Sequence, residues 1–350
     1  MLLHLGLPTA SEEARSRAIG VLHDLAAEFG AELSFLGENQ ALCEIAGPLP
    51  AAARTRFGDL PYVKSVLHAS DAPELHELRG REPSVVRIGG AVFGGGYASL
   101  IAGPCAVEAE DLLLRIAGRV HEAGAALLRG GAYKPRTSPH SFQGLGRDGL
   151  ARLGRVRDAV GIGVVTEVLD PRDVDAVGEV ADAFQIGARS MANHTLLREV
   201  ASHGKPVLLK RGLAATVREF QLAAETLLVA GRPEVVLCER GIRSFAGPTR
   251  NILDLGAVAH LKRETHLPIL VDPSHASGRS ALVPPLARAG IAAGADGVMV
   301  EVHPAPEEAL SDGSQAISYE SLESLSSDLE KLTELDGRRW VRPEPAAAAS

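Results

Sequence analysis

The sequence contains few aromatic residues and few cysteines, and each shortage narrows the functions it can have. Phe, Trp and Tyr make up 4% of its 350 residues, and acidic residues outnumber basic ones by 44 to 36. Proteins that bind nucleic acid depend on positive charge and on stacking rings, so we expect no nucleic-acid partner. The three cysteines, Cys43, Cys105 and Cys238, are too few and too scattered for a disulfide framework.

Long apolar runs are also missing from the sequence. No segment approaches the ~20 apolar residues that a membrane-spanning helix needs, and the first residues lack the basic region of a secretory signal. We therefore expect no membrane partner and a cytoplasmic location. The length allows one large α/β domain with a smaller domain attached.

From about residue 90 onward, short β-prone runs alternate with segments of helical period, which is typical of parallel βα units. Eight runs are predicted to be strands: 97–103, 124–130, 162–168, 182–188, 206–212, 235–241, 268–274 and 297–303. Helices are predicted between them, for example over 216–231 and 249–264, and a last one over 318–335. Eight evenly spaced units favour a (β/α)8 TIM barrel of the α/β class; an open doubly wound sheet is the alternative.

The first 75 residues follow a different pattern. Their predicted elements run β-α-β-β-α-β, the order of a ferredoxin-like α+β domain. Such a domain over 1–75 either binds a small regulator or acts only as a dimerisation or stabilising cap, and the sequence leaves both open. We predict a catalytic barrel over 76–335, with a hairpin at about 85–96 that closes its bottom, and a disordered tail over 336–350.

Polar residues follow the predicted strands, and the carboxyl ends of barrel strands share one face. Four of these residues are of metal-binding type: Cys105, His275, Glu301 and Asp312. One thiolate, one imidazole and two carboxylates suit a divalent transition ion better than Mg²⁺. Taken singly, each has a structural alternative, such as a buried apolar cysteine or an aspartate in a turn before glycine.

Cations gather at the same strand ends. The loop "RGGAYKPRT" (129–137) carries three positive charges and no carboxylate. The cations in or beside the predicted loops are Arg129, Lys134, Arg136, Arg189, Lys210, Arg211 and Arg240. Arg and Lys in a cleft bind phosphate or carboxylate groups, and their number here indicates more than one anionic group. The alternative is ordinary surface charge.

The stretches "AGPCAVE", "LRGGAYKPRTSPHSFQGLG", "LLKRG", "LVDPSHASGR" and "EVHPAPEEALSDGSQ" closely resemble 3-deoxy-D-arabino-heptulosonate 7-phosphate (DAHP) synthase. The resemblance covers about residues 90–335. The N-terminal pattern is similar to the regulatory extension in one branch of the short microbial form of this family. The resemblance implies a metal-dependent barrel transferase that condenses phosphoenolpyruvate with erythrose 4-phosphate. This reaction is the first step of the shikimate pathway of aromatic amino acid biosynthesis.

The resemblance also implies roles for individual residues. It makes Cys105, His275, Glu301 and Asp312 the metal ligands, with Mn²⁺ as the expected ion and Fe²⁺, Co²⁺ or Zn²⁺ as alternatives. Phosphoenolpyruvate would be bound by these residues: Arg129, Lys134, Arg189, Lys210, Arg240 and the backbone around Ala188.

The same resemblance assigns the second substrate, and the chemistry of the implied reaction suggests the proton transfers. Arg136 and Thr137 would bind the phosphate of erythrose 4-phosphate. Lys134 would donate a proton to the nascent alkoxide, and Glu167 or a group on the metal would steer the attacking water. His140 stands where an aromatic ring is expected.

Two rival functions remain open at this point. The sister enzyme that makes 3-deoxy-octulosonate 8-phosphate from arabinose 5-phosphate shares the barrel, but "KPRTS" (134–138) favours erythrose 4-phosphate. The other rival is a barrel that has lost catalysis and only binds partners. The resemblance further implies a homo-oligomer, a dimer or tetramer, and an aromatic amino acid effector, tyrosine or phenylalanine.

Overall fold

The computed structural model describes residues 2–7, 11–36, 42–47, 49–67, 74–78, 81–136, 138–245 and 247–343. The chain divides into two compact units, Met1–Glu74 and Leu75–Ser350. Within the described ranges, none of the helices combines the length and the apolar character that crossing a bilayer requires.

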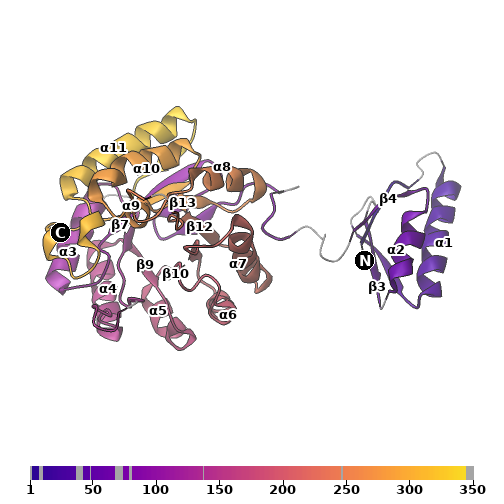
Figure 1. Cartoon of the computed structure of the whole chain (residues 1–350), viewed down its shortest axis with the longest axis horizontal. Helices are drawn as coiled ribbons and strands as arrows, with labels where there is room; N and C mark the ends of the chain where they lie inside the picture. Colours follow the sequence, from indigo (N-terminus) through magenta and orange to yellow (C-terminus); the bar gives the residue numbers. More distant parts are fainter. Residues whose placement is uncertain are drawn as a thin grey trace. The chain divides into compact units, whose positions relative to one another are not determined.

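The first unit is a four-stranded antiparallel sheet with two helices (Figure 1). Its elements are β1 (Leu2–Leu5), α1 (Glu12–Glu28), β2 (Glu32–Leu36), β3 (Leu42–Ala46), α2 (Ala51–Gly58) and β4 (Val63–Leu67). Ser11 starts α1, because its Oγ accepts a hydrogen bond from the Ala14 amide at 3.1 Å. Leu3, Leu22 and Phe57 are fully buried between sheet and helices. The strand order β2-β3-β1-β4 agrees with the predicted ferredoxin-like fold.

The second unit is built on eight parallel strands that form a closed ring. They are β7 (Tyr97–Gly103), β8 (Leu127–Arg129), β9 (Gly163–Glu167), β10 (Ala183–Ile186), β11 (Val207–Lys210), β12 (Val235–Glu239), β13 (Ile269–Val271) and β14 (Gly297–Glu301). The ring closes because β14 pairs with β7, from Gly297 with Ser99 to Glu301 with Gly103. The predicted (β/α)8 barrel is therefore confirmed, and the open doubly wound sheet is excluded.

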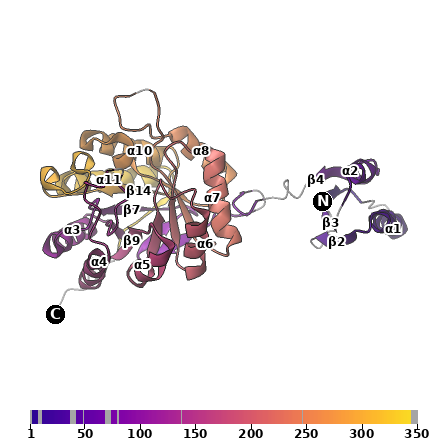
Figure 2. The same ribbon diagram turned by 60° about the horizontal axis from the view of Figure 1, so that its bottom comes forward.

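Helices surround the strands on the outside (Figure 2). They are α3 (Glu110–Glu122), α4 (Arg147–Val160), α5 (Val174–Val180), α6 (His194–His203), α7 (Val217–Val229), α8 (Leu255–Glu264), α10 (Val283–Ala292) and α11 (Tyr319–Leu335), with the short α9 (Pro273–Ser277) after β13. Their apolar faces and the outward side chains of the strands form one buried cluster. This packing fixes the strand ends, from which the polar loops start.

A hairpin covers one end of the barrel. It consists of β5 (Val86–Ile88) and β6 (Ala91–Phe93). Ile88 and Phe93 share a buried apolar cluster with inward side chains of the strands, such as Leu127 and Val165. This end lies at the start of the strands, because Gly89 lies against Gly163, the first residue of β9. The opposite end of the barrel is left to the polar loops.

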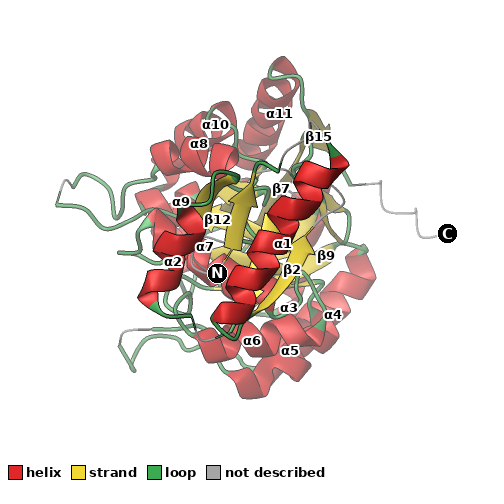
Figure 3. Ribbon diagram, turned by 90° about the vertical axis from the view of Figure 1, so that its right-hand side faces the viewer, coloured by secondary structure: helices red, strands yellow, loops and turns green. Residues whose placement is uncertain are grey.

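The end of the chain differs from the prediction. Residues Arg339–Val341 form β15, which pairs in parallel with Tyr97–Ser99 of β7 beside α11 (Figure 3). The side chain of Arg338 donates to the carbonyls of Ile291 and Ala295, at 2.8 and 2.7 Å. For these residues the prediction of a disordered tail is wrong. Their order comes from contacts with residues far away in the sequence, which the local composition of the segment does not indicate. Residues 344–350 lie outside the described residues.

Candidate active site and metal centre

A pocket lies among the carboxyl ends of the strands. It is lined by Arg129, Lys134, Pro135, Arg136, Glu167, Gln185, Gly187, Ala188, Arg189, Lys210, Arg240, Arg250, His275 and Asp312. Seven of these side chains are cationic and two are carboxylates, although the whole chain is acidic. The pocket therefore has the electrostatic character of a site for multiply charged anions.

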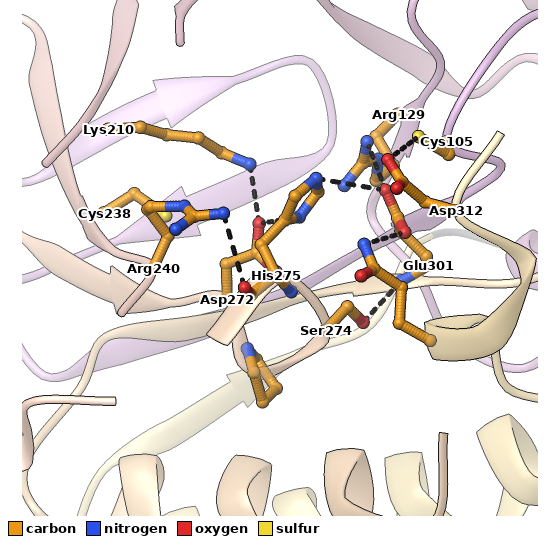
Figure 4. A network of polar contacts seen from close by, with 12 residues as sticks. Cys105, Arg129, Lys210, Cys238, Arg240, Asp272, Ser274, His275, Glu301 and Asp312 are labelled. Atoms are coloured by element: carbon orange, nitrogen blue, oxygen red, sulfur yellow. Dashed lines mark hydrogen bonds and ion pairs between the residues drawn. The ribbon is translucent and has the colours of Figure 1, made fainter. Parts of the chain in front are cut away.

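The four predicted ligand residues meet at one side of this pocket. Donor atoms of Cys105, His275, Glu301 and Asp312 all lie within 4.8 Å of one another. They come from the loop after β7, from α9, from the end of β14 and from the loop that follows it. Figure 4 shows these side chains directed toward a common point. The convergence that the strand order predicted is present in the structure.

The imidazole of His275 is held in one orientation by Asp272. Asp272 starts α9, and its Oδ1 accepts a hydrogen bond from the His275 amide at 3.0 Å. Its Oδ2 lies 2.8 Å from His275 Nδ1 and 2.6 Å from Lys210 Nζ. Burial opposes the charge on Asp272, but His275 and Lys210 outweigh it and hold the pKa of this carboxyl well below its usual range. Because a carboxylate only accepts, Nδ1 carries the proton and Nε2 is left as a ligand atom.

Cys105 is a buried thiol among polar groups. Its Sγ lies 2.9 Å from Lys134 Nζ and 3.1 Å from both Ser311 Oγ and Asp312 Oδ2. Burial raises the pKa of this thiol to about 12, with the Glu301 charge adding to the rise and Lys134 opposing it. The thiol then donates to Asp312, and a cation bound here would displace that proton.

Glu301 is fully buried at the end of β14. Its Oε1 lies 3.0 Å from Arg129 Nη2 and 3.3 Å from His275 Nε2. The Arg129 contact is an ion pair without hydrogen-bond geometry, so among the described residues Oε1 has no hydrogen-bond partner. A buried carboxylate oxygen left in this way is a suitable metal ligand. With a thiolate, an imidazole nitrogen and a second carboxylate beside it, the donor set fits a divalent transition ion.

The cations of the pocket differ in how far they are already paired. Arg129 is 4% exposed, yet its Nε and Nη1 have no hydrogen-bond partner among the described residues. Lys210 is paired with Asp272, and Arg240 donates only weakly to two carbonyls, of Gly241 at 3.2 Å and His275 at 3.3 Å. Buried donors without partners cost free energy. These groups are therefore arranged for an anion.

Glu167 ends β9 and is 8% exposed. Burial raises the pKa of its carboxyl, while Lys134 and Lys210 oppose the rise. A Cβ at Gly187 would lie 1.7 Å from Glu167 Oε1, so the carboxylate occupies the space that a side chain there would fill. The pocket thus holds a buried carboxyl with a raised pKa, a property that general acids and bases share.

The remaining predicted residues are placed as follows. Arg136 contacts Ser311 Oγ and lies 3.5 Å from Asp312 Oδ2, and Arg189 is exposed at the pocket. Ala188 lines the pocket, whereas Thr137 lies outside the described residues.

Arg211 is separated from the pocket, although it follows Lys210 directly. Its Nη1 donates to Glu239 Oε2 at 2.8 Å and to Asp254 Oδ2 at 3.0 Å. These two carboxylates hold its charge, so it has no part in anion binding.

Sequence reasoning missed three polar side chains of the site. Gln185 and Arg250 line the pocket, and Gln315 lies behind Glu301. Gln185 points inward from β10, which strand alternation could have indicated. Arg250 lies in an irregular loop and Gln315 in a short 3-10 turn, and neither segment carries a periodic signal in the sequence.

Several known proteins are similar to this chain in sequence. A family profile described as "DAHP synthetase I family" matches residues 80–336. The phospho-2-dehydro-3-deoxyheptonate aldolase of Thermotoga maritima is 46% identical over 302 residues, which cover 86% of this chain and 89% of the relative. A 2-dehydro-3-deoxyphosphooctonate aldolase of Acidithiobacillus ferrooxidans is 36% identical over 244 residues, covering 65% of this chain and 86% of the relative.

Two solved structures from Thermotoga maritima are similar as well. The crystal structure of its DAHP synthase aligns with 97% of this chain and 98% of the other, at 43% identity and a TM-score of 0.76. A truncated form of its 3-deoxy-D-arabino-heptulosonate 7-phosphate synthase covers 76% of this chain and 98% of the other, at 46% identity and a TM-score of 0.71. The matched region contains every residue of the pocket, and the chain belongs to the DAHP synthetase I family.

Proposed function

We propose that this protein is a metal-dependent DAHP synthase. It condenses phosphoenolpyruvate with D-erythrose 4-phosphate and water, giving 3-deoxy-D-arabino-heptulosonate 7-phosphate and phosphate. The observation that carries the proposal is the shared pocket of a Cys-His-Glu-Asp cluster and buried arginine donors without partners. The family match and the 46% identical Thermotoga aldolase support it.

Cys105, His275, Glu301 and Asp312 would hold the metal. When bound, a divalent ion supplies a Lewis acid that polarises the aldehyde group of the sugar phosphate. We propose Mn²⁺ for this role, with Fe²⁺, Co²⁺ or Zn²⁺ as alternatives, because the sulfur ligand disfavours Mg²⁺.

The cations divide between the two substrates. Phosphoenolpyruvate is bound by these groups: Arg129, Lys134, Arg189, Lys210, Arg240 and the backbone at Ala188. The unpaired Nε and Nη1 of Arg129 leave two N–H donor groups for a carboxylate or phosphate. Arg136, assisted by Thr137, binds the phosphate of erythrose 4-phosphate. Holding two mutually repelling phosphates in one pocket is positioning catalysis.

The protein groups then move protons at defined atoms. Carbon 3 of phosphoenolpyruvate attacks the aldehyde carbon, and Lys134 Nζ, 2.9 Å from Cys105 Sγ, gives its proton to the new hydroxyl oxygen. Water adds to carbon 2, where positive charge develops, and Glu167 takes the proton of that water. The tetrahedral centre collapses to a ketone with cleavage of the C–O bond, and inorganic phosphate leaves.

The test measures phosphate release with phosphoenolpyruvate and each of two sugars, erythrose 4-phosphate and arabinose 5-phosphate. We expect turnover with erythrose 4-phosphate, its loss on chelation and its return with Mn²⁺. Cys105→Ser and His275→Ala should lose bound metal and activity together. Preference for arabinose 5-phosphate would identify the sister activity, and full turnover in a verified metal-free sample would refute the metal mechanism.

We further propose that the ferredoxin-like domain, residues 1–75, regulates the barrel over 76–335 and that tyrosine or phenylalanine is the effector. The fourteen described residues that line the pocket at the strand ends all belong to the barrel unit. A typical coupling of ~1–3 kcal/mol between two sites would give measurable but incomplete inhibition. The protein would act as a homo-oligomer, a dimer or tetramer, in the cytoplasm.

A shortened chain tests this regulation. It should begin at Leu75, because the Glu225 carboxylate accepts the backbone N–H groups of Leu75 and His76 at 2.8 and 3.0 Å. We expect it to stay active and to lose the inhibition that the full chain shows. If tyrosine, phenylalanine and tryptophan all leave the full chain unaffected, the domain is a cap and not a regulator.

A further inference from the structure

Behind the metal-binding cluster lies a glutamine that contacts one of the proposed ligands. Gln315 is 1% exposed, in the loop after β14. Its Nε2 donates to Glu301 Oε2 at 2.6 Å, and its Oε1 accepts a hydrogen bond from Arg250 Nη1 at 3.2 Å. Arg250 comes from the loop after β12, so the three side chains form a chain of hydrogen bonds across two loops.

The direction of these two hydrogen bonds is fixed by Arg250 at one end and Glu301 at the other. A guanidinium only donates hydrogen bonds and an ionised carboxylate only accepts them. The amide oxygen of Gln315 therefore faces Arg250, and its NH₂ group faces Glu301. A glutamate in place of Gln315 would satisfy Arg250 but oppose Glu301, and a lysine would do the reverse. A glutamine matches both neighbours without adding charge.

We propose that Gln315, fixed by Arg250, is a positioning residue that makes Glu301 a one-oxygen metal ligand. The hydrogen bond occupies Oε2, and Oε1 remains the oxygen that lies 3.3 Å from His275 Nε2. A carboxylate that binds through one oxygen leaves more of the coordination sphere for a substrate oxygen. The inference rests on the proposed metal centre and goes beyond it by assigning residues that are not ligands.

The same arginine reaches the other carboxylate of the cluster. Arg250 Nη1 lies 3.6 Å from Asp312 Oδ1, and its charge reduces the repulsion between the Asp312 and Glu301 carboxylates. The loop holding Asp312 and Gln315 has little freedom, because Asp312 has a φ of 54° and a Cβ at Gly313 would lie 1.9 Å from the Pro306 carbonyl oxygen. The positions of the ligand and of its support are set together.

The first experiment measures Mn²⁺ binding by calorimetry on the full chain, without substrates. Gln315→Met keeps the size of the side chain and removes the donor, and we expect a 10- to 100-fold weaker affinity, the typical effect of losing such a support. Ser314→Ala is the matched control. The neighbouring Ser314 is exposed, and its hydroxyl donates to the Gly278 carbonyl and not to Glu301, so this variant should bind Mn²⁺ as the wild type does. Gln315→Glu, of the same shape, replaces Gln315→Met if the latter does not fold.

A second readout separates positioning from general damage. The visible spectrum of the Co²⁺-loaded protein should change in Gln315→Met, because Oε2 of Glu301 becomes free to coordinate. Arg250→Leu should weaken Mn²⁺ binding, and Arg250→Lys, which keeps a cationic donor, should restore part of it. Melting temperatures of the chelated proteins measure separately the stability lost when the buried Glu301 carboxylate loses its hydrogen-bond donor.

The outcomes distinguish this inference from the function on which it rests. Wild-type Mn²⁺ affinity and an unchanged Co²⁺ spectrum in the Gln315 variants would overturn the positioning role alone. Absence of Mn²⁺ binding in the wild type would overturn the proposed metal centre itself.

Discussion

Replacing Gly187 with alanine should slow catalysis by displacing the Glu167 carboxyl. The added Cβ would lie 1.7 Å from Glu167 Oε1 and 2.7 Å from its Cδ, whereas ordinary contact begins at 3.4 Å. The carboxyl must therefore retreat by roughly 1.7 Å, and a displacement of about 1 Å in a site can cost ~10²-fold in rate. We expect kcat to fall ~10²-fold, which corresponds to about 2.7 kcal/mol.

Phosphate release under saturating substrates measures this effect. Mn²⁺ affinity should not change, because the three atoms nearest to the added Cβ all belong to Glu167, which is not one of the four proposed ligands. The control is Gly118→Ala on α3, where an added Cβ meets nothing within 4 Å. That variant should keep its activity and gain up to about 1 kcal/mol of stability, because alanine favours a helix over glycine.

A double variant shows whether the effect runs through Glu167. In a Glu167→Ala background the atoms that Gly187→Ala would strike are missing, so the second substitution should add almost nothing. A Gly187→Ala enzyme with wild-type kcat would refute the catalytic role of the Glu167 position. Fully additive losses would show that Gly187 acts on another group.

Two further predictions follow from the charges of the site. Arg136→Ala should lower kcat/KM for erythrose 4-phosphate by about 10²–10³, from a charge-assisted contact worth roughly 2–4 kcal/mol, and leave phosphoenolpyruvate affinity almost unchanged by calorimetry. If phosphoenolpyruvate affinity collapses instead, the two phosphate sites are assigned the wrong way round. Arg211→Met should lower the free energy of unfolding, measured with urea, by ~3–5 kcal/mol. The substitution leaves Glu239, which is 0% exposed, buried without its cation. An unfolding free energy equal to that of the wild type would contradict this reasoning.

The sequence predicted the barrel and the meeting of the metal-binding residues for one physical reason. In a ring of parallel strands, residues such as Cys105 and Glu301 share a face however far apart they are in the chain. The sequence could not show which of Lys210 and Arg211 faces the pocket. Neighbouring residues at a strand end face opposite sides, and the register that decides between them comes from the whole sheet. Gln315 was missed for a similar reason, since one partner, Glu301, ends β14 and the other, Arg250, lies in the loop after β12.

The metal cluster lies across the seam where the barrel closes. Cys105 follows β7, the first strand of the ring, whereas Glu301 ends β14, the last one. Joining these strands closes a loop of about 200 residues, at an entropic cost. A bound ion would connect the first and last strands of the ring. At a free-ion concentration of 100 times its dissociation constant, it would stabilise the folded protein by about 2.7 kcal/mol. When the ion is removed, the hydrogen-exchange rates of the backbone amides should therefore increase more in β7 and β14 than in β10.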